Sequence, residues 1–143
     1  MLLAAQSGRL EIVRSLLESG AKISARDVLG RSALFFASRL GHVELAKLLL
    51  ENKPCANDGS LHEASQGFHL QVMQMLIDNG HDANYRSAKH EGRTALGEMA
   101  RNGAIRDLTT AEEALEILYA ADASPLFKVH GKTVIFLPRQ QGE

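Results

Sequence analysis

Several residue types that carry particular functions are scarce in this chain of 143 residues, which has one Cys, three Pro and no Trp. A single Cys excludes a disulfide framework and favours a reducing compartment, the cytoplasm, with the nucleus left open. No apolar run reaches the roughly 18 residues that a membrane-spanning helix needs, so we expect no membrane segment. The formal net charge is −1 and there is no basic stripe, which argues against general nucleic-acid binding.

The sequence also lacks a set of residues that would perform a reaction. Cys55 has no adjacent general base, so a plain loop Cys is the favoured interpretation. The letters Gly131-Lys132-Thr133 end like a phosphate-binding loop, but the Gly five positions before them and a preceding strand are missing. The paired carboxylates Glu112 and Glu113 are explained by a capping box that Thr110 begins. We therefore expect no catalytic site, no cofactor and no metal.

What the chain does contain is a recurring unit of two short helices. Residues 30–50 hold a Gly-bearing turn, a helix capped by Ser32, a stop at Gly41, and a second helix with one apolar face. Gly8 and Gly41 occupy the same place in two copies, 33 residues apart. Two short helices cannot bury their apolar faces alone, so the copies are expected to stack on one another. Further copies begin near Leu61, Gly92 and Gly131.

These copies resemble the ankyrin repeat family, whose pattern runs D-x-x-G-x-T-P-L-H-x-A-A-x-x-G-H-x-x-[VI]-V-x-x-L-L-x-x-G-A-D-x-N. The resemblance covers essentially the whole chain, and it looks most like the ankyrin regions of large fungal proteins. It implies an all-α fold, an ankyrin-repeat solenoid of stacked helix-turn-helix units with short β-hairpin fingers. On this pattern residues 1–143 form a single domain. Its repeats span about 1–24, 25–57, 58–84, 85–126 with an insertion at about 104–110, and a partial fifth repeat at 127–143. The first copy starts late, as in a piece of a longer array or an array with a ragged start.

The junctions between copies depart from the pattern. Ser24 and Leu34 are ten positions apart, whereas the equivalent Asn57 and Leu61 are four apart, so six residues are missing and we expect a tight turn at Asp58-Gly59 instead of a third finger. Phe68 stands where Gly normally ends the first helix. Because a left-handed Phe is strained, Gly67 is expected to take that role. A fifth first helix is expected to begin at Thr133 and to stop before Pro138.

Most of the His residues have structural positions in the family pattern. The resemblance implies structural hydrogen bonds for His42, His62 and His69, and the alternative of metal ligation lacks the usual ligand spacing. His81 lies at a helix end, where a partly charged ring would suit the helix dipole. His90 and His130 lie on fingers and are expected to be able to contact a partner.

The family likeness implies that partners bind the concave side, which is formed by the fingers and the first-helix faces. Apolar residues rimmed by Arg are typical of binding patches, although single exposed Leu residues are also normal on protein surfaces. Carried over position by position, the expected contact residues are Gln6, Ser7, Val28, Leu29, Arg31, Arg39, Leu40, Gln66, His90, Glu91, Arg93, Arg101 and Asn102.

These observations favour a non-catalytic protein–protein interaction module that binds a protein partner or another segment of its parent chain. The alternative is a structural spacer or regulatory segment of a larger, fungal-type signalling protein, because the missing finger leaves a gap in the concave surface. The stack could also associate with itself through its uncapped ends. The segment Val134–Leu137 favours this, because it is apolar and rich in residues that form strands.

Overall fold

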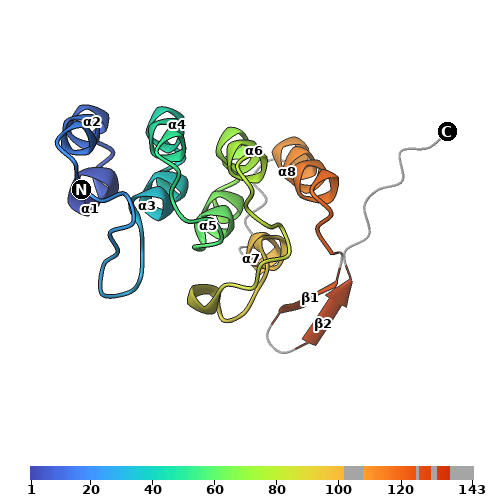
Figure 1. Cartoon of the computed structure of the whole chain (residues 1–143). Helices are drawn as coiled ribbons and strands as arrows, with labels where there is room; N and C mark the ends of the chain where they lie inside the picture. Colours follow the sequence, from blue (N-terminus) through green and yellow to red (C-terminus); the bar gives the residue numbers. More distant parts are fainter. Residues whose placement is uncertain (102–107, 125, 130–131, 136–143) are drawn as a thin grey trace.

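Two rows of short helices make up most of the molecule (Figure 1). The computed structural model describes residues 1–101, 108–124, 126–129 and 132–135. The helices are α1 (Leu2–Gln6), α2 (Leu10–Glu18), α3 (Ala33–Leu40), α4 (Val43–Glu51), α5 (Ser60–Gln66), α6 (Leu70–Asp78), the 3-10 helix η1 (Ala88–His90), α7 (Ala95–Arg101) and α8 (Leu108–Ala120). The strands are β1 (Leu126–Val129) and β2 (Lys132–Ile135).

Each helix packs against the equivalent helix of the next copy. In one row α1, α3, α5 and α7 are in contact in turn, and in the other row α2, α4, α6 and α8 are in contact in turn. The core lies between these rows, and its fully buried side chains include Leu34, Leu45, Leu49, Leu76 and Leu96. The predicted apolar faces of the second copy are therefore confirmed, as is the all-α repeat solenoid.

The predicted helix boundaries of the second copy are also confirmed. The hydroxyl of Ser32 accepts a hydrogen bond from the amide of Phe35, 3.1 Å away, and so caps α3. Gly41 ends the same helix in the left-handed conformation, with φ at 67°. Thr94 caps α7 in the same way, since its hydroxyl accepts from the amide of Gly97 at 3.2 Å.

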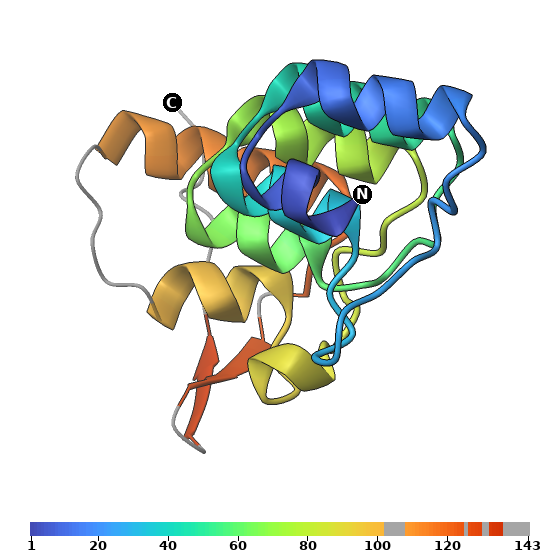
Figure 2. The ribbon, with the colours of Figure 1, turned by 90° about the vertical axis from the view of Figure 1, so that its left-hand side faces the viewer.

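Two fingers project on the same side of the helices (Figure 2). The second finger closes with a bridge between Arg26 and Ser32, and the fourth finger closes with a bridge between Ser87 and Arg93. As predicted, one carboxylate oxygen of Asp27 holds the second finger by accepting from the amides of Leu29 and Arg31. Among the described residues these two bridges are the only ones outside β1 and β2, so the third copy lacks a paired finger, as expected.

The expectation for Phe68 is wrong. Phe68 itself takes the left-handed conformation, with φ at 55°, while Gly67 stays right-handed with φ at −87°. Phe68 occupies the place that Gly8 and Gly41 hold in the other copies, and both of these are left-handed with φ at 67°. The turn keeps the same backbone hydrogen bonds in all three copies, so the strain of the left-handed conformation falls on Phe68.

Two expectations for the last third of the chain are also wrong. Thr110 does not begin α8, because the helix already starts at Leu108, so the proposed capping box lies inside it. Thr133 begins no helix: β1 and β2 form an antiparallel hairpin in which Lys128 pairs with Thr133. The β-branched residues Thr133, Val134 and Ile135 favour this extended backbone. The insertion expected at about 104–110 lies mostly outside the described residues.

Candidate functional site

A pocket of about 430 Å³ lies on the finger side of the stack, between the second and fourth fingers. Seven residues that the sequence predicted as contacts line it: Leu29, Arg31, Gln66, His90, Glu91, Arg93 and Arg101. Four further residues complete the lining: Phe35, Glu63, Lys89 and Glu98. The pocket therefore combines side chains from three successive copies, at the level where the third finger is missing.

The floor of the pocket is formed around His90. This side chain is only 6% exposed, so His90 lines the pocket but offers a partner little free surface. Its ring stacks on His62, with centroids 4.7 Å apart, and lies 6.2 Å from the ring of Phe35. A Cβ at Gly59 would lie 3.2 Å from the ring, which places His90 over the short third junction. With no third finger to cover α5, the fourth finger folds onto it and buries His90.

Hydrogen bonds fix the two stacked His rings. Nε2 of His90 donates to Glu63 Oε1 at 2.8 Å, and Nδ1 of His90 is hydrogen-bonded to the hydroxyl of Ser87 at 2.8 Å. Nε2 of His62 donates to the backbone carbonyl of Arg93 at 2.7 Å. Burial lowers the pKa of His62 to about 4, although its bond to Arg93 acts in the opposite direction. His62 is thus neutral at pH 7 and has the predicted structural role.

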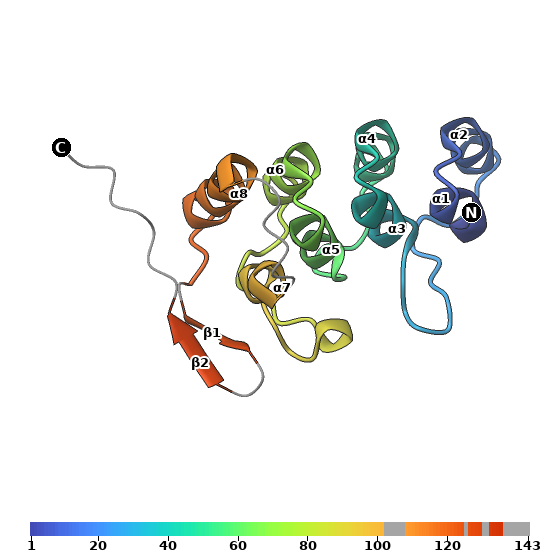
Figure 3. The ribbon, with the colours of Figure 1, turned by 180° about the vertical axis from the view of Figure 1, so that it is seen from behind.

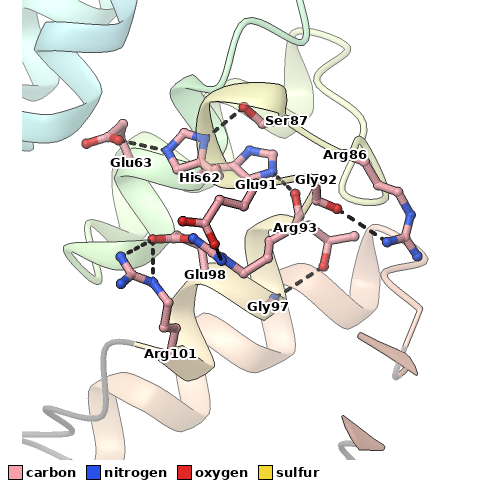
Figure 4. A network of polar contacts seen from close by, with 12 residues as sticks. His62, Glu63, Arg86, Ser87, Glu91, Gly92, Arg93, Gly97, Glu98 and Arg101 are labelled. Carbon is pink, nitrogen blue, oxygen red and sulfur yellow. Dashed lines mark hydrogen bonds and ion pairs between the residues drawn. The ribbon is translucent and has the colours of Figure 1, made fainter. Parts of the chain in front are cut away.

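One wall of the pocket is a cluster of ion pairs around Glu98 (Figure 4). Glu98 is 2% exposed, and it accepts from Nε of Arg93 at 2.7 Å and from Nη2 of Arg101 at 2.8 Å. Burial raises the pKa of Glu98, but the hydrogen bonds from Arg101 and Arg93 outweigh it and hold this pKa below its usual value. Arg93 also pairs with the exposed Glu91 at 2.6 Å. This wall is fully ionised at neutral pH.

The opposite side is built by the second finger and by Lys89. Nε of Arg31 donates to Asp27 Oδ2 at 2.7 Å, and its guanidinium lies 5.0 Å from the ring of Phe36. Lys89 extends from η1 toward the second finger, so that its Cε would lie 3.4 Å from a Cβ placed on Gly30. Its ammonium donates to the backbone carbonyl of Asp58 at 3.2 Å. Lys89 therefore crosses the gap that the missing finger leaves.

The remaining predicted contact residues lie outside this pocket. Gln6, Ser7, Val28, Arg39 and Leu40 are exposed but are separate from its lining. Nε of Arg39 is 3.9 Å from Glu63, so Arg39 lies beside the pocket without lining it. Asn102 lies outside the described residues.

The other His residues hold the helix ends together. Nδ1 of His42 accepts from the amide of Leu45, and Nε2 of His69 donates to the carbonyl of Arg39. The expectation of a partly charged His81 is wrong, because its ring is buried and burial lowers its pKa. His130 lies outside the described residues.

Sequence reasoning missed Phe35, Glu63, Lys89 and Glu98 as site residues. The pairing of Glu98 with Arg101 could have been predicted, because the two residues are three positions apart on one helix and side chains at that spacing meet. Lys89 and Glu63 are 26 positions apart in the chain, and they reach the same pocket only because a finger is missing.

Three features bear on what the described residues can do: a metal-ligand cluster, a paired Cys and a membrane-spanning helix. Within them no group of three or more His, Cys, Asp or Glu side chains could hold a metal ion. Cys55 is free and exposed in this part of the chain. In the same residues no helix is both long and apolar enough to cross a membrane.

The stacked helix pairs and their one-sided fingers define a helical repeat solenoid. A family model for ankyrin repeats, in three copies, matches residues 1–87, and the chain belongs to the ankyrin repeat family. Ankyrin repeats generally act as protein–protein interaction modules and are typically non-enzymatic.

Relatives occur in plants, in a fungus and in a nematode. The chain is 31% identical over 106 residues to a Medicago truncatula protein called Protein VAPYRIN-LIKE, covering 71% of this chain and 23% of that protein. It is 33% identical over 99 residues to the ankyrin repeat domain-containing protein SAT10 of Stachybotrys chartarum, covering 65% of this chain and 5% of that protein. It is 47% identical over 81 residues to the E3 ubiquitin-protein ligase XBAT33 of Arabidopsis thaliana, covering 52% and 16%. The chain thus spans less than a quarter of each of these relatives.

Proposed function

We propose that this chain is a non-catalytic module that binds a protein partner, or another segment of a longer parent chain, through its finger side. One observation carries the proposal: predicted contact residues from three successive copies line a single pocket. The exposed Leu29 and the half-buried Arg31 at its edge combine an apolar anchor with a guanidinium, as binding hot spots do. We place the module in a reducing compartment, the cytoplasm or the nucleus, in keeping with its one free Cys.

The test is partner recovery from cells by the wild-type chain and by a Leu29→Glu, Arg31→Glu double variant. A matched control changes Lys47→Glu on the exposed face of α4, which is far from the fingers. We expect the double variant to lose the proteins that the wild type and the control both retain. Each retained protein is then purified and titrated against the three chains. Equal affinity for all three would contradict binding at the finger side.

A second candidate function is that of a structural spacer or regulatory segment in a larger multidomain signalling protein. Two observations favour it: the chain spans a small part of its relatives, and the Arg93, Glu98 and Arg101 side chains are paired with one another. The same recovery experiment separates the two candidates. A spacer would recover no specific protein with the wild-type chain, and a parent protein lacking residues 1–101 would regain function if a different ankyrin stack of equal length replaced them.

A further inference from the structure

The gap left by the missing third finger is only partly filled by the neighbouring copies. Figure 3 shows the second and fourth fingers on either side of α5, with no comparable finger beneath that helix. His90 fills the base of the gap over Gly59 and His62, and the Lys89 side chain spans it. Above them the pocket stays open, lined by residues of both fingers. A segment of another protein could therefore occupy the place where the chain's own finger is missing.

The charges that this pocket exposes are mainly positive, although the whole chain carries a formal net charge of −1. The carboxylates of Glu98 and Glu63 are only 2% and 11% exposed, because Arg93, Arg101 and His90 hold them. By contrast Arg101 is 40% exposed and Lys89 is exposed. The one widely exposed carboxylate is Glu91, at 81%, and it is already paired with Arg93.

Two cations of the pocket keep unused donors. The only bond of Lys89 among the described residues is to the carbonyl of Asp58, which occupies one of the three ammonium protons. In that part of the chain the guanidinium of Arg31 donates through Nε alone, so its terminal nitrogens are available. Lys89 therefore has no carboxylate partner of its own there, and an incoming acid could supply one.

The rim of the same pocket is apolar. Leu29 is a lining residue and is 63% exposed at the tip of the second finger, and Val28 beside it is fully exposed. Phe35, which is 5% exposed, also lines the pocket. An occupant with one apolar side chain on Leu29 would place a neighbouring residue within reach of Lys89.

We propose that the pocket at the missing third finger docks an extended acidic segment of a protein partner, with an apolar side chain against Leu29 and a carboxylate at Lys89 and Arg31. This inference rests on the proposed interaction function and deepens it by giving the partner's chemistry. Ion pairs already fix the side chains of one pocket wall, so less conformational entropy is lost when such a segment binds. A nucleic acid fits less well, because Glu91 and Asp27 lie among the cations and no basic stripe extends beyond the pocket.

The test is selection of short random peptides displayed on phage against the wild-type chain, followed by titration of the selected peptides as synthetic molecules. We expect enrichment of Asp or Glu one to three positions from an apolar residue, and affinity that falls with added salt. Lys89→Glu should weaken binding by at least about tenfold, since it replaces attraction with repulsion at a desolvated contact. The control Lys47→Glu makes the same charge change on α4 and should leave affinity within about twofold.

A second variant guards against loss of folding. Leu29→Ser lies at an exposed fingertip, so it should keep the melting temperature of the wild type and still weaken the peptides. Selected peptides without acidic enrichment, or affinities that neither Lys89→Glu nor Leu29→Ser changes, would overturn the inference. So would failure to select any peptide, or displacement of the peptides by a random single-stranded oligonucleotide at equal concentration. Each of these results leaves the proposed function standing if the cellular partner is still lost in the Leu29→Glu, Arg31→Glu variant.

Discussion

At the scale of single residues, Glu98 is the group on which the pocket wall depends. Glu98→Gln removes the charge that two guanidinium groups share, and Arg93 is only 10% exposed. Removing one partner from a buried ion pair leaves the other charge unpaired, so we expect the free energy of unfolding to fall by about 3 kcal/mol. Denaturation in urea measures this. Glu91→Gln is the control, and because Glu91 is exposed to solvent this change should lower the free energy of unfolding much less than Glu98→Gln does.

The buried ring of His62 makes the stability depend on pH. Its pKa is about 4 in the folded chain against an ordinary value of 6.5, so between these values the unfolded chain binds more protons. Stability from this group is therefore complete above pH 6.5 and is lost as the pH falls from 6.5 to 4, by up to about 3 kcal/mol. The lowered pKa of His81 acts in the same direction.

Urea unfolding at a series of pH values tests this prediction. The control is the His62→Gln variant, which lacks the titrating ring and should lose stability less steeply over that range. Equal slopes for the two chains would show that His62 is not the group responsible.

At the scale of helices, the end of α3 is fixed by a contact as well as by backbone conformation. Gly41 is left-handed, and a Cβ there would also lie 2.4 Å from the ring of His69. Gly20 is left-handed too, with φ at 86°, but a Cβ there would meet nothing within 4 Å. We expect Gly20→Ala to cost about 1–2 kcal/mol from backbone strain alone, and Gly41→Ala to cost at least about 1 kcal/mol more from overpacking. Thermal melts of both variants compare them, and equal costs would argue against a tight His69 contact.

The elements that could be predicted from the sequence are those set by local chemistry. Ser32 caps α3 and Gly41 ends it because both act within a few residues of their own position. Leu45 and Leu49 could be assigned to the core because their spacing puts them on one face of α4. The left-handed Phe68 was not predicted, because the turn keeps the position that it has at Gly8 and Gly41 even though a residue with a Cβ is strained there.

The pocket could be predicted only in part, for a related reason. Family positions pointed to Leu29, Arg31, Arg93 and Arg101 as finger-side residues, and the structure brings them together. The burial of His90 follows instead from the fourth finger folding onto α5 in place of the missing one. Such a rearrangement depends on packing between copies, and no single-copy pattern contains that information.

At the scale of the whole molecule, stability is shared between neighbouring copies because each helix pair buries its apolar face on the next. Leu49 is fully buried on α4, which packs against α2, α3 and α6. Leu49→Ala should therefore cost about 2–5 kcal/mol through lost burial and the cavity left behind.

In a short stack with nearest-neighbour coupling, that loss should reach helices that do not touch Leu49. Hydrogen exchange measured residue by residue should show faster exchange in α5 and α7 as well as in α4, while Leu40→Ala, at a half-exposed position, should change exchange little. If protection were lost in α4 alone, the copies would be unfolding independently. The rigid two-finger pocket would then lack the support from neighbouring copies that the proposed binding requires.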